Sequence, residues 1–278
     1  MNENIEGRGP CYLRTEGISQ EASEDLKKAY LNMAPSQTLK WIESGKNPSE
    51  QNVEIEGTEP YIVGGHTASG YWVDTKRRTT VKGLYAAGDV AGGCPQKYVT
   101  GALAEGEIAA LTAISELGKI SAIDESDIER HLSEVTDFLY GNTDGTFTTE
   151  QLEDAMQKVM DAYAGGIGSH YQFNEKQLKL AKEKIEQIET LSEKANAKDY
   201  HELMFVYELK ERLTVCQVLI EHLKARKETR WHSFAENLDY PEKSDEWLKY
   251  VNTRKVDGRI EVKYRNLVGR GETYEHSN

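Results

Sequence analysis

Cysteine is scarce in this sequence. The 278 residues contain three cysteines, Cys11, Cys94 and Cys216, and none of them lies in a CxxC pair. Isolated cysteines provide neither a disulfide framework nor the ligand set of an iron–sulfur or zinc site. We therefore expect this chain to bind no metal.

Long basic runs and long apolar runs are also absent. The net charge is −13, and an acidic chain without a basic stretch is a poor partner for nucleic acid or an anionic membrane surface. No stretch reaches the roughly 18 apolar residues of a membrane span. The opening MNENIEGRGP differs from the basic and then apolar pattern of a signal peptide. We therefore expect no nucleic-acid partner, no direct membrane span and a cytoplasmic location.

The most informative segment is 79–117, TTVKGLYAAGDVAGGCPQKYVTGALAEGEIAALTAISEL. Its first part, Val81 to Ala87, is mostly apolar and predicts a strand buried on both faces. Gly88 and Asp89 then end this strand at the carboxyl edge, where open α/β sheets bind their ligands. Glycine lets the backbone come close to a ligand, and the aspartate carboxylate suits the hydroxyl groups of a ribose or ribityl chain.

A helix is expected to follow from about Thr100. The pattern ALAEGEIAALTAISEL places Leu103, Ile108, Leu111 and Ile114 near one face. The unpaired N–H groups and the dipole of its amino end would favour an electron-rich ligand atom, such as the N1/C2 carbonyl edge of a reduced flavin. The alternative is an ordinary strand–turn–helix corner with a solvated carboxylate and glycines that serve only the turn.

The wider string resembles a known motif. VKGLYAAGD, followed by AGG and by GALAEG before an alanine-rich helix, resembles the second FAD motif of the fumarate reductase, succinate dehydrogenase and L-aspartate oxidase flavoprotein family, which includes adenylylsulfate reductase alpha subunits. The resemblance implies FAD as the cofactor, with the ribityl chain at Asp89 and the isoalloxazine ring at the backbone of Ala102 to Ala104. The predicted cofactor-binding residues are Gly88, Asp89, Thr100, Ala102, Leu103 and Ala104.

Two further residues are predicted to face the substrate. The string HTASG resembles the HTMGG-like motif of the family, whose histidine lies at the flavin and the substrate, so His66 is a candidate catalytic residue. The alternative for a lone histidine is a structural position in a turn. In the turn after the GD motif, succinate and fumarate enzymes carry an arginine where CPQKYVTG has Lys97, whereas the adenylylsulfate reductase pattern carries a lysine. Because an ammonium group lacks the guanidinium fork that matches a carboxylate, the lysine favours another small anionic substrate.

The resemblance covers only the C-terminal portion of the family. The opening MNENIEGRGPCYLRT is similar to the late part of the capping domain, where a GRGP-like stretch precedes a short strand. The 278 residues contain no GxGxxG turn to hold the pyrophosphate, and no counterpart of the proton-donating arginine of the family. We therefore expect either a split or truncated reading frame or a separate chain that supplies the N-terminal FAD-binding half.

The remaining sequence is mostly helical in pattern. Two short helices are expected between Ser19 and Gly45, with a break at Pro35. A capping box of Thr148 and Gln151 predicts the start of another helix. Two longer helices with apolar stripes are predicted over Asn174 to about Ala197 and over Tyr200 to Arg226.

The C-terminal region is expected to close the helical part and to form a hairpin. In the string ARKETR, Arg226 and Arg230 are expected to satisfy the last carbonyl groups of the preceding helix. The string KVDGR, from Lys255 to Arg259, predicts a hairpin turn, with Ile260 to Tyr264 as the second strand. This strand is a candidate edge for a partner subunit.

The predicted fold class is α/β plus α. A remnant of a capping domain (1–58) precedes the C-terminal segment of a Rossmann-like FAD-binding domain (59–118), a three-helix bundle domain (119–232) and an extension with a short β-hairpin (233–278). A composition of 38% hydrophobic and 29% charged residues is that of a globular protein.

Three functions remain open at this point. The first is an FAD-dependent two-electron oxidoreductase flavoprotein subunit similar to adenylylsulfate reductase, which passes electrons between a small anionic substrate and an iron–sulfur, ferredoxin-like partner subunit. The second is a dicarboxylate oxidoreductase of the fumarate reductase or succinate dehydrogenase type. The third is a non-catalytic remnant or interaction subunit that lacks the N-terminal FAD half.

Overall fold

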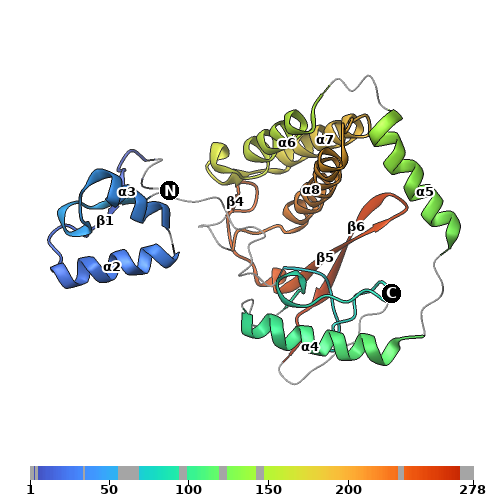
Figure 1. The fold of residues 1–278 in the computed structure, drawn as a ribbon, viewed down its shortest axis with the longest axis horizontal. Helices are drawn as coiled ribbons and strands as arrows, with labels where there is room; N and C mark the ends of the chain where they lie inside the picture. The colour runs from blue at the N-terminus through green and yellow to red at the C-terminus, as the bar shows by residue number, and fades with distance from the viewer. Residues whose placement is uncertain are drawn as a thin grey trace. The chain divides into compact units, whose positions relative to one another are not determined.

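The structure is a computed structural model of the 278-residue chain (Figure 1). It describes residues 3, 6–33, 35–55, 69–93, 99–118, 124–141, 147–230 and 235–269. The chain divides into two compact units, Met1–Glu59 and Pro60–Asn278. The domain boundaries predicted from the sequence at 58, 118 and 232 stay predictions.

The first unit is a helical hairpin beside a small sheet. Its core residue is Trp41, which is 1% exposed and packs edge-on against Tyr30, with 5.2 Å between the ring centroids. The two helices confirm the expected pair, and the second begins at Pro35, where proline is tolerated because the first helical N–H has no partner within the helix. The elements are α2 (Gln20–Met33), α3 (Pro35–Ser44), and the antiparallel strands β1 (Cys11–Leu13) and β2 (Val53–Ile55).

The segment 69–93 in the second unit is irregular, and the predicted strand from Val81 to Ala87 is wrong. This part of the chain turns, and the side chains of Val81 and Leu84 are 59% and 49% exposed. The only regular pairings of the segment are two isolated bridges, Tyr71 with Ala91 and Arg78 with Tyr85. Among the described residues no neighbouring strand is present to pair with the apolar run, so its backbone bonds locally instead.

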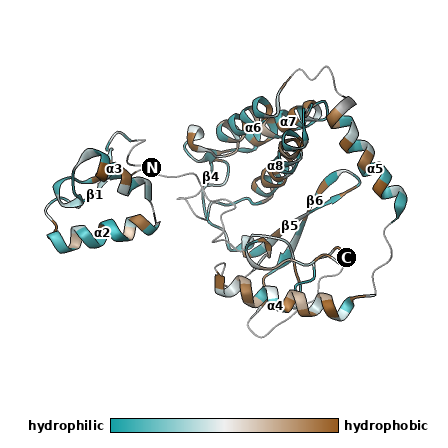
Figure 2. Ribbon diagram, viewed as in Figure 1, coloured by the Kyte–Doolittle hydropathy of each residue, from teal (hydrophilic) through white to brown (hydrophobic). Residues whose placement is uncertain are grey.

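The helix α4 (Val99–Glu116) confirms the helix predicted after the glycine turn. Its burial is the reverse of the usual pattern, because the apolar residues are exposed while Glu105 and Thr112 are buried. Figure 2 shows the hydrophobic residues along this helix. They are exposed by between 38% and 73%: Val99, Leu103, Ile108, Leu111 and Ile114. The predicted apolar stripe therefore exists, but no described element of the chain covers it.

Three helices pack around the main core, as their periodicity predicted (Figure 1). They are α6 (Thr149–Tyr163), α7 (Glu175–Ser192) and α8 (Tyr200–Ala225). The capping box is confirmed, because Gln151 N–H donates to Thr148 Oγ1 and the Thr148 N–H donates to Gln151 Oε1. The core includes Leu152, Met156, Phe173, Leu178, Ala181, Ile185, Leu209, Leu213 and Ile220.

A smaller apolar cluster adjoins one end of the bundle. The helix α5 (Glu125–Thr136) runs into a π-helical turn, η3 (Asp137–Gly141), which brings Phe138 against Val206 of α8. Among the helices of the described residues, none is long and apolar enough to cross a membrane.

The C-terminal region forms the predicted β-hairpin. The strands β5 (Lys249–Val256) and β6 (Arg259–Asn266) pair antiparallel, with Asp257 and Gly258 in the turn. These two residues have φ values of 47° and 75°, as a two-residue hairpin turn with left-handed backbone requires. Both strands contact α8. Two short segments, β3 (Gln172–Phe173) and β4 (Glu236–Asn237), form a parallel pair.

The expected role of the two arginines in ARKETR requires a correction. Arg226 donates to the carbonyl oxygens of Trp247 and Lys249, at 2.9 and 3.0 Å, and Arg230 donates to that of Ser244 at 2.9 Å. Their acceptors therefore belong to the loop and strand that follow, and not to the last turn of α8. The reason is the carboxylate between them, Glu228, which turns both guanidinium groups towards the downstream chain.

Candidate functional site

The six residues predicted to bind the cofactor lie where a tight turn meets the amino-terminal part of α4. The turn is a 3-10 helix, η2 (Gly88–Val90), and Gly88 has a φ of 71°. A Cβ atom at Gly88 would lie 3.1 Å from the Cβ of Ala102, so a larger residue would push the turn away from the helix. Glycine is thus required here for both its backbone conformation and its size.

The side chains around this corner leave its surface open. Asp89, Thr100, Leu103 and Ala104 are exposed, and Ala102 is half-buried. The first four N–H groups of an α-helix have no partner within the helix, and they carry the positive end of its dipole. An exposed carboxylate fits the ribityl hydroxyls of a flavin, because it can accept their hydrogen bonds. The small residues at the helix amino end beside it fit the electron-rich edge of the flavin ring.

A buried carboxylate holds the turn against the helix. Glu105, which is 4% exposed, accepts the N–H of Gly88 at 3.0 Å through Oε2. Its other oxygen, Oε1, forms an ion pair with Arg77 Nη2 at 3.1 Å. This pair was not predicted from the sequence. The available signal was an acidic residue within the mostly apolar string GALAEGEIAAL, which by itself does not indicate where its partner lies.

The two predicted catalytic residues, His66 and Lys97, lie outside the described residues, as does Cys94. Their roles therefore stay predictions. Both flank described parts of the corner in sequence: His66 precedes the segment 69–93, and Lys97 lies two positions before Val99, the first residue of α4.

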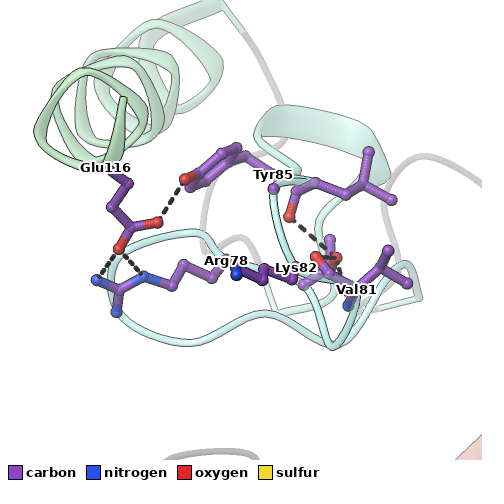
Figure 3. A pocket seen from close by; sticks show the side chains of 8 residues that line it. Arg78, Val81, Lys82, Tyr85 and Glu116 are labelled. Carbon is purple, nitrogen blue, oxygen red and sulfur yellow. Dashed lines mark hydrogen bonds and ion pairs between the residues drawn. The ribbon is translucent and has the colours of Figure 1, made fainter. Parts of the chain in front are cut away.

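A second polar cluster lies at the other end of α4 and lines a pocket of about 280 Å³ (Figure 3). The Glu116 carboxylate accepts the Tyr85 hydroxyl at 2.5 Å and the Arg78 Nε and Nη2 groups at 2.8 and 2.5 Å. A further ion pair joins Arg78 to Asp74 at 3.1 Å. The pocket is lined by Arg78, Thr79, Val81, Lys82, Gly83, Leu84, Tyr85 and Glu116.

The charges of Arg78, Asp74 and Glu116 compensate one another. The bond to Glu116 raises the pKa of Tyr85 and, together with Asp74, that of Arg78. Burial acts to raise the pKa of Asp74, but N–H groups of Arg78 and Lys76 and the Arg78 guanidinium outweigh it, so the pKa lies below its ordinary value. Because α4 rises 1.5 Å per residue, Glu116 lies roughly 20 Å along the helix from Ala102. We interpret this cluster as a clamp on the chain and not as part of the predicted flavin corner.

Comparison with known proteins shows which flavoproteins the chain resembles. The model of the fumarate reductase flavoprotein C-terminal family matches residues 153–275. The chain is similar to the C-terminal portion of oxidoreductase flavoproteins of the fumarate reductase and succinate dehydrogenase family, and the resemblance found in its sequence is confirmed.

Within this class, the chain is similar to adenylylsulfate reductase. It is 26% identical to the alpha subunit of adenylylsulfate reductase from Megalodesulfovibrio gigas, over 95% of this chain and 47% of the relative. The adenylylsulfate reductase structure from Archaeoglobus fulgidus matches with a TM-score of 0.82 and 28% identity, over 100% of this chain and 50% of that chain. The chain thus spans about half the length of these relatives.

Two further proteins also match the chain. An FAD-dependent oxidoreductase from Methanocaldococcus jannaschii is 28% identical over 68% of this chain and 35% of the relative. The E. coli quinol fumarate reductase matches with a TM-score of 0.74 and 17% identity, over 99% of this chain and 48% of that chain, which shows a shared fold.

Proposed function

We propose that this chain is the C-terminal part of an FAD-dependent flavoprotein subunit of the adenylylsulfate reductase type. The whole protein would pass two electrons between a small anionic substrate and an iron–sulfur partner subunit. The observation that carries the proposal is the match to adenylylsulfate reductase over the full length of the chain, at a TM-score of 0.82 and 28% identity.

The corner between η2 and α4 supports FAD as the cofactor. When bound, FAD would supply the two-electron chemistry. Asp89 is exposed at the turn, and its carboxylate can accept hydrogen bonds from ribityl hydroxyls. The amino end of α4, around Thr100, offers N–H groups and a positive dipole to the electron-rich edge of the flavin. The family resemblance implies that the ring lies at the backbone of Ala102 to Ala104.

A further part of the proposal is that an N-terminal FAD-binding half covers the apolar face of α4. Five apolar side chains of this helix are between 38% and 73% exposed, which is unusual for a helix of a soluble protein. The chain matches about half of the length of its relatives, and a counterpart of their other half would be large enough to bury this face. That half would also contribute the pyrophosphate site.

Flavin absorbance tests this proposal. The purified 278-residue chain is expected to lack a flavin band, because its sequence has no GxGxxG turn to hold the pyrophosphate. Co-expression with an N-terminal half, from a neighbouring reading frame or a full-length relative, is expected to give a yellow complex. Stoichiometric flavin on the chain alone would contradict the division between the two halves. A complex that forms without flavin would refute the proposed cofactor site.

A second candidate is a dicarboxylate oxidoreductase, which the shared fold with quinol fumarate reductase favours. The residue that separates the two candidates is Lys97. A single ammonium group can bind a compact oxyanion, but it does not reproduce the two parallel hydrogen bonds of an arginine to a carboxylate.

Substitution of this lysine separates the two candidates experimentally. For the adenylylsulfate type, Lys97→Arg in the completed enzyme is expected to leave the native turnover unchanged or to lower it. Lys82→Arg, at an exposed lysine of the segment 69–93, is the matched control. Turnover of succinate or fumarate that Lys97→Arg raises would overturn the first candidate and establish the dicarboxylate reaction.

A further inference from the structure

Glu105 occupies an unexpected position for a carboxylate. It is 4% exposed on a helix whose apolar residues face outwards. Removing an ionised carboxylate from water is unfavourable unless charges and hydrogen-bond donors replace the water. The surroundings of Glu105 must therefore supply such groups, and they come from a distant part of the chain.

Two groups of the segment 69–93 compensate the charge. The Gly88 N–H donates to Oε2 at 3.0 Å, and Arg77 Nη2 pairs with Oε1 at 3.1 Å. Arg77 is itself fixed, because its Nη1 donates to the Asp74 carbonyl oxygen at 3.1 Å and its own carbonyl accepts the Ala86 N–H at 3.1 Å. One carboxylate thus connects two points of this segment to α4.

The two sides of this connection are the two halves of the flavin corner. Gly88 directly precedes Asp89, and Glu105 directly follows Ala104. The contact between Gly88 and Ala102 limits how closely the turn approaches, but van der Waals contact does not fix direction. A hydrogen bond to a buried carboxylate is directional, and it fixes the orientation of the Ala87–Gly88 peptide, directly before the one that leads into Asp89.

We infer that Glu105 is a positioning residue for the flavin site, with Arg77 as its charge partner. Its carboxylate sets the spacing and orientation of the turn that carries Asp89 relative to the helix that carries Ala102 to Ala104. This role rests on the proposed function, because it gives a purpose to the geometry of that same site.

Hydrogen exchange at the Gly88 amide in the chain itself tests this inference without a flavin. In Glu105→Ala the exchange of this amide is expected to accelerate by roughly ten- to a hundredfold, the factor for losing a hydrogen bond to a charged group. In Glu105→Gln the amide oxygen still accepts, so a smaller acceleration is expected. Glu107→Ala, which removes an exposed carboxylate two residues further along α4, is the matched control and should leave Gly88 unchanged. Amides of α7 and α8 should exchange as in the wild type in all three variants.

Three outcomes would overturn the inference. The first is an unchanged Gly88 amide in Glu105→Ala, and the second is an equal acceleration in Glu105→Ala and Glu107→Ala. The third outcome matters if Glu105→Ala unfolds the whole region 69–118, because the glutamine variant then decides. If Glu105→Gln loses the protection of the Gly88 amide as completely as Glu105→Ala does, a hydrogen-bond acceptor at this position is not what holds the turn.

The same variants separate this inference from the proposed function. Flavin content is measured in complexes with the N-terminal half. If Glu105→Ala frees the Gly88 amide but the complex binds FAD as the wild type does, Glu105 orients the turn without a role in FAD binding, and the corner is not the flavin site. Accelerated exchange together with weakened FAD binding supports both.

Discussion

Glu228 is the residue whose loss should most affect the stability of the C-terminal region. Its side chain is 0% exposed, and it accepts four hydrogen bonds. The donors are Arg226 Nη1 at 2.8 Å, Arg230 Nε and Nη2 at 2.8 Å, and the Ser244 N–H at 3.0 Å. Since both arginines also donate to carbonyl groups of residues 244–249, Glu228 ties the end of α8 to the loop and to β5.

The magnitude follows from what Glu228→Ala leaves behind. Removing one partner of a buried ion pair costs about 3–5 kcal/mol. The side chains of Arg226 and Arg230 are 34% and 20% exposed and can recover some hydration, so we expect the lower end of that range. For a unit of this size, a loss of about 3 kcal/mol lowers the Tm by about 6–12 °C.

Thermal and urea unfolding, followed by far-UV circular dichroism, measures this effect. Glu246→Ala removes an exposed carboxylate from the same loop and is the matched control, with an expected change in the free energy of unfolding within about 0.5 kcal/mol. A Glu228→Ala variant within about 1 kcal/mol of the wild type would refute the reasoning, because a buried and fully bonded carboxylate cannot be removed at that cost.

The pH dependence gives an independent check on Glu228. Burial acts to raise the pKa of its carboxyl group, but the bonds from Arg230, Ser244 and Arg226 outweigh burial and lower it. A lowered folded-state pKa means that the stabilisation is complete above the unfolded pKa of about 4.3 and is lost as the pH falls through the folded value. The Tm difference between the wild type and Glu228→Gln should therefore narrow below about pH 4. A difference that stays constant on acidification would contradict this interpretation.

Two further predictions concern the contacts of the hairpin. Burial, and then the charge of Arg226, lower the pKa of His222 below 6.5. The stability of the fold should therefore decrease as the pH drops through 6.5 towards the pKa of the folded state. An NMR titration that gives His222 a pKa of 6.5 or more would contradict this. Arg265 lies 3.9 Å from the Trp72 ring centroid and 4.9 Å from that of Tyr250. A double-mutant cycle of Trp72→Leu and Arg265→Met should give a coupling of about 0.5–2 kcal/mol, and no coupling would rule out a stabilising contact between β6 and the segment 69–93.

The helical part of the fold was predictable because its signals are local. Leu178 and Ile185 recur at helical spacing in α7, as do Leu209 and Leu213 in α8, and each is at most 1% exposed. The capping box of Thr148 and Gln151 and the Asp-Gly hairpin turn depend on residues only a few positions apart. Such patterns determine the local backbone whatever the rest of the chain does.

The failures have the opposite cause, since they depend on distant partners. The apolar run from Val81 to Ala87 has the composition of a buried strand, but a strand forms only where a neighbour pairs with it. Arg226 was expected to bond the carbonyls of its own helix, but it bonds those of residues 247 and 249.

The candidate site was predictable only in part for the same reason. The turn and the helix that flank the corner follow from the glycines and from the helical pattern of the sequence. The buried pair of Arg77 and Glu105, which joins them, has no local signature, because each residue alone reads as an ordinary surface charge.

In the proposed function, the corner of η2 and α4 binds the ribityl chain and the ring of FAD. The measurement that tests it most directly is the Kd for FAD of the complex between this chain and its N-terminal half, compared between the wild type and Asp89→Ala. Asp127→Ala, at an exposed carboxylate of α5, is the matched control. Loss of hydrogen bonds to an ionised group predicts that Asp89→Ala raises the Kd by roughly ten- to a hundredfold while the control leaves it unchanged. An equal Kd for the wild type and Asp89→Ala would contradict the placement of the flavin at this corner.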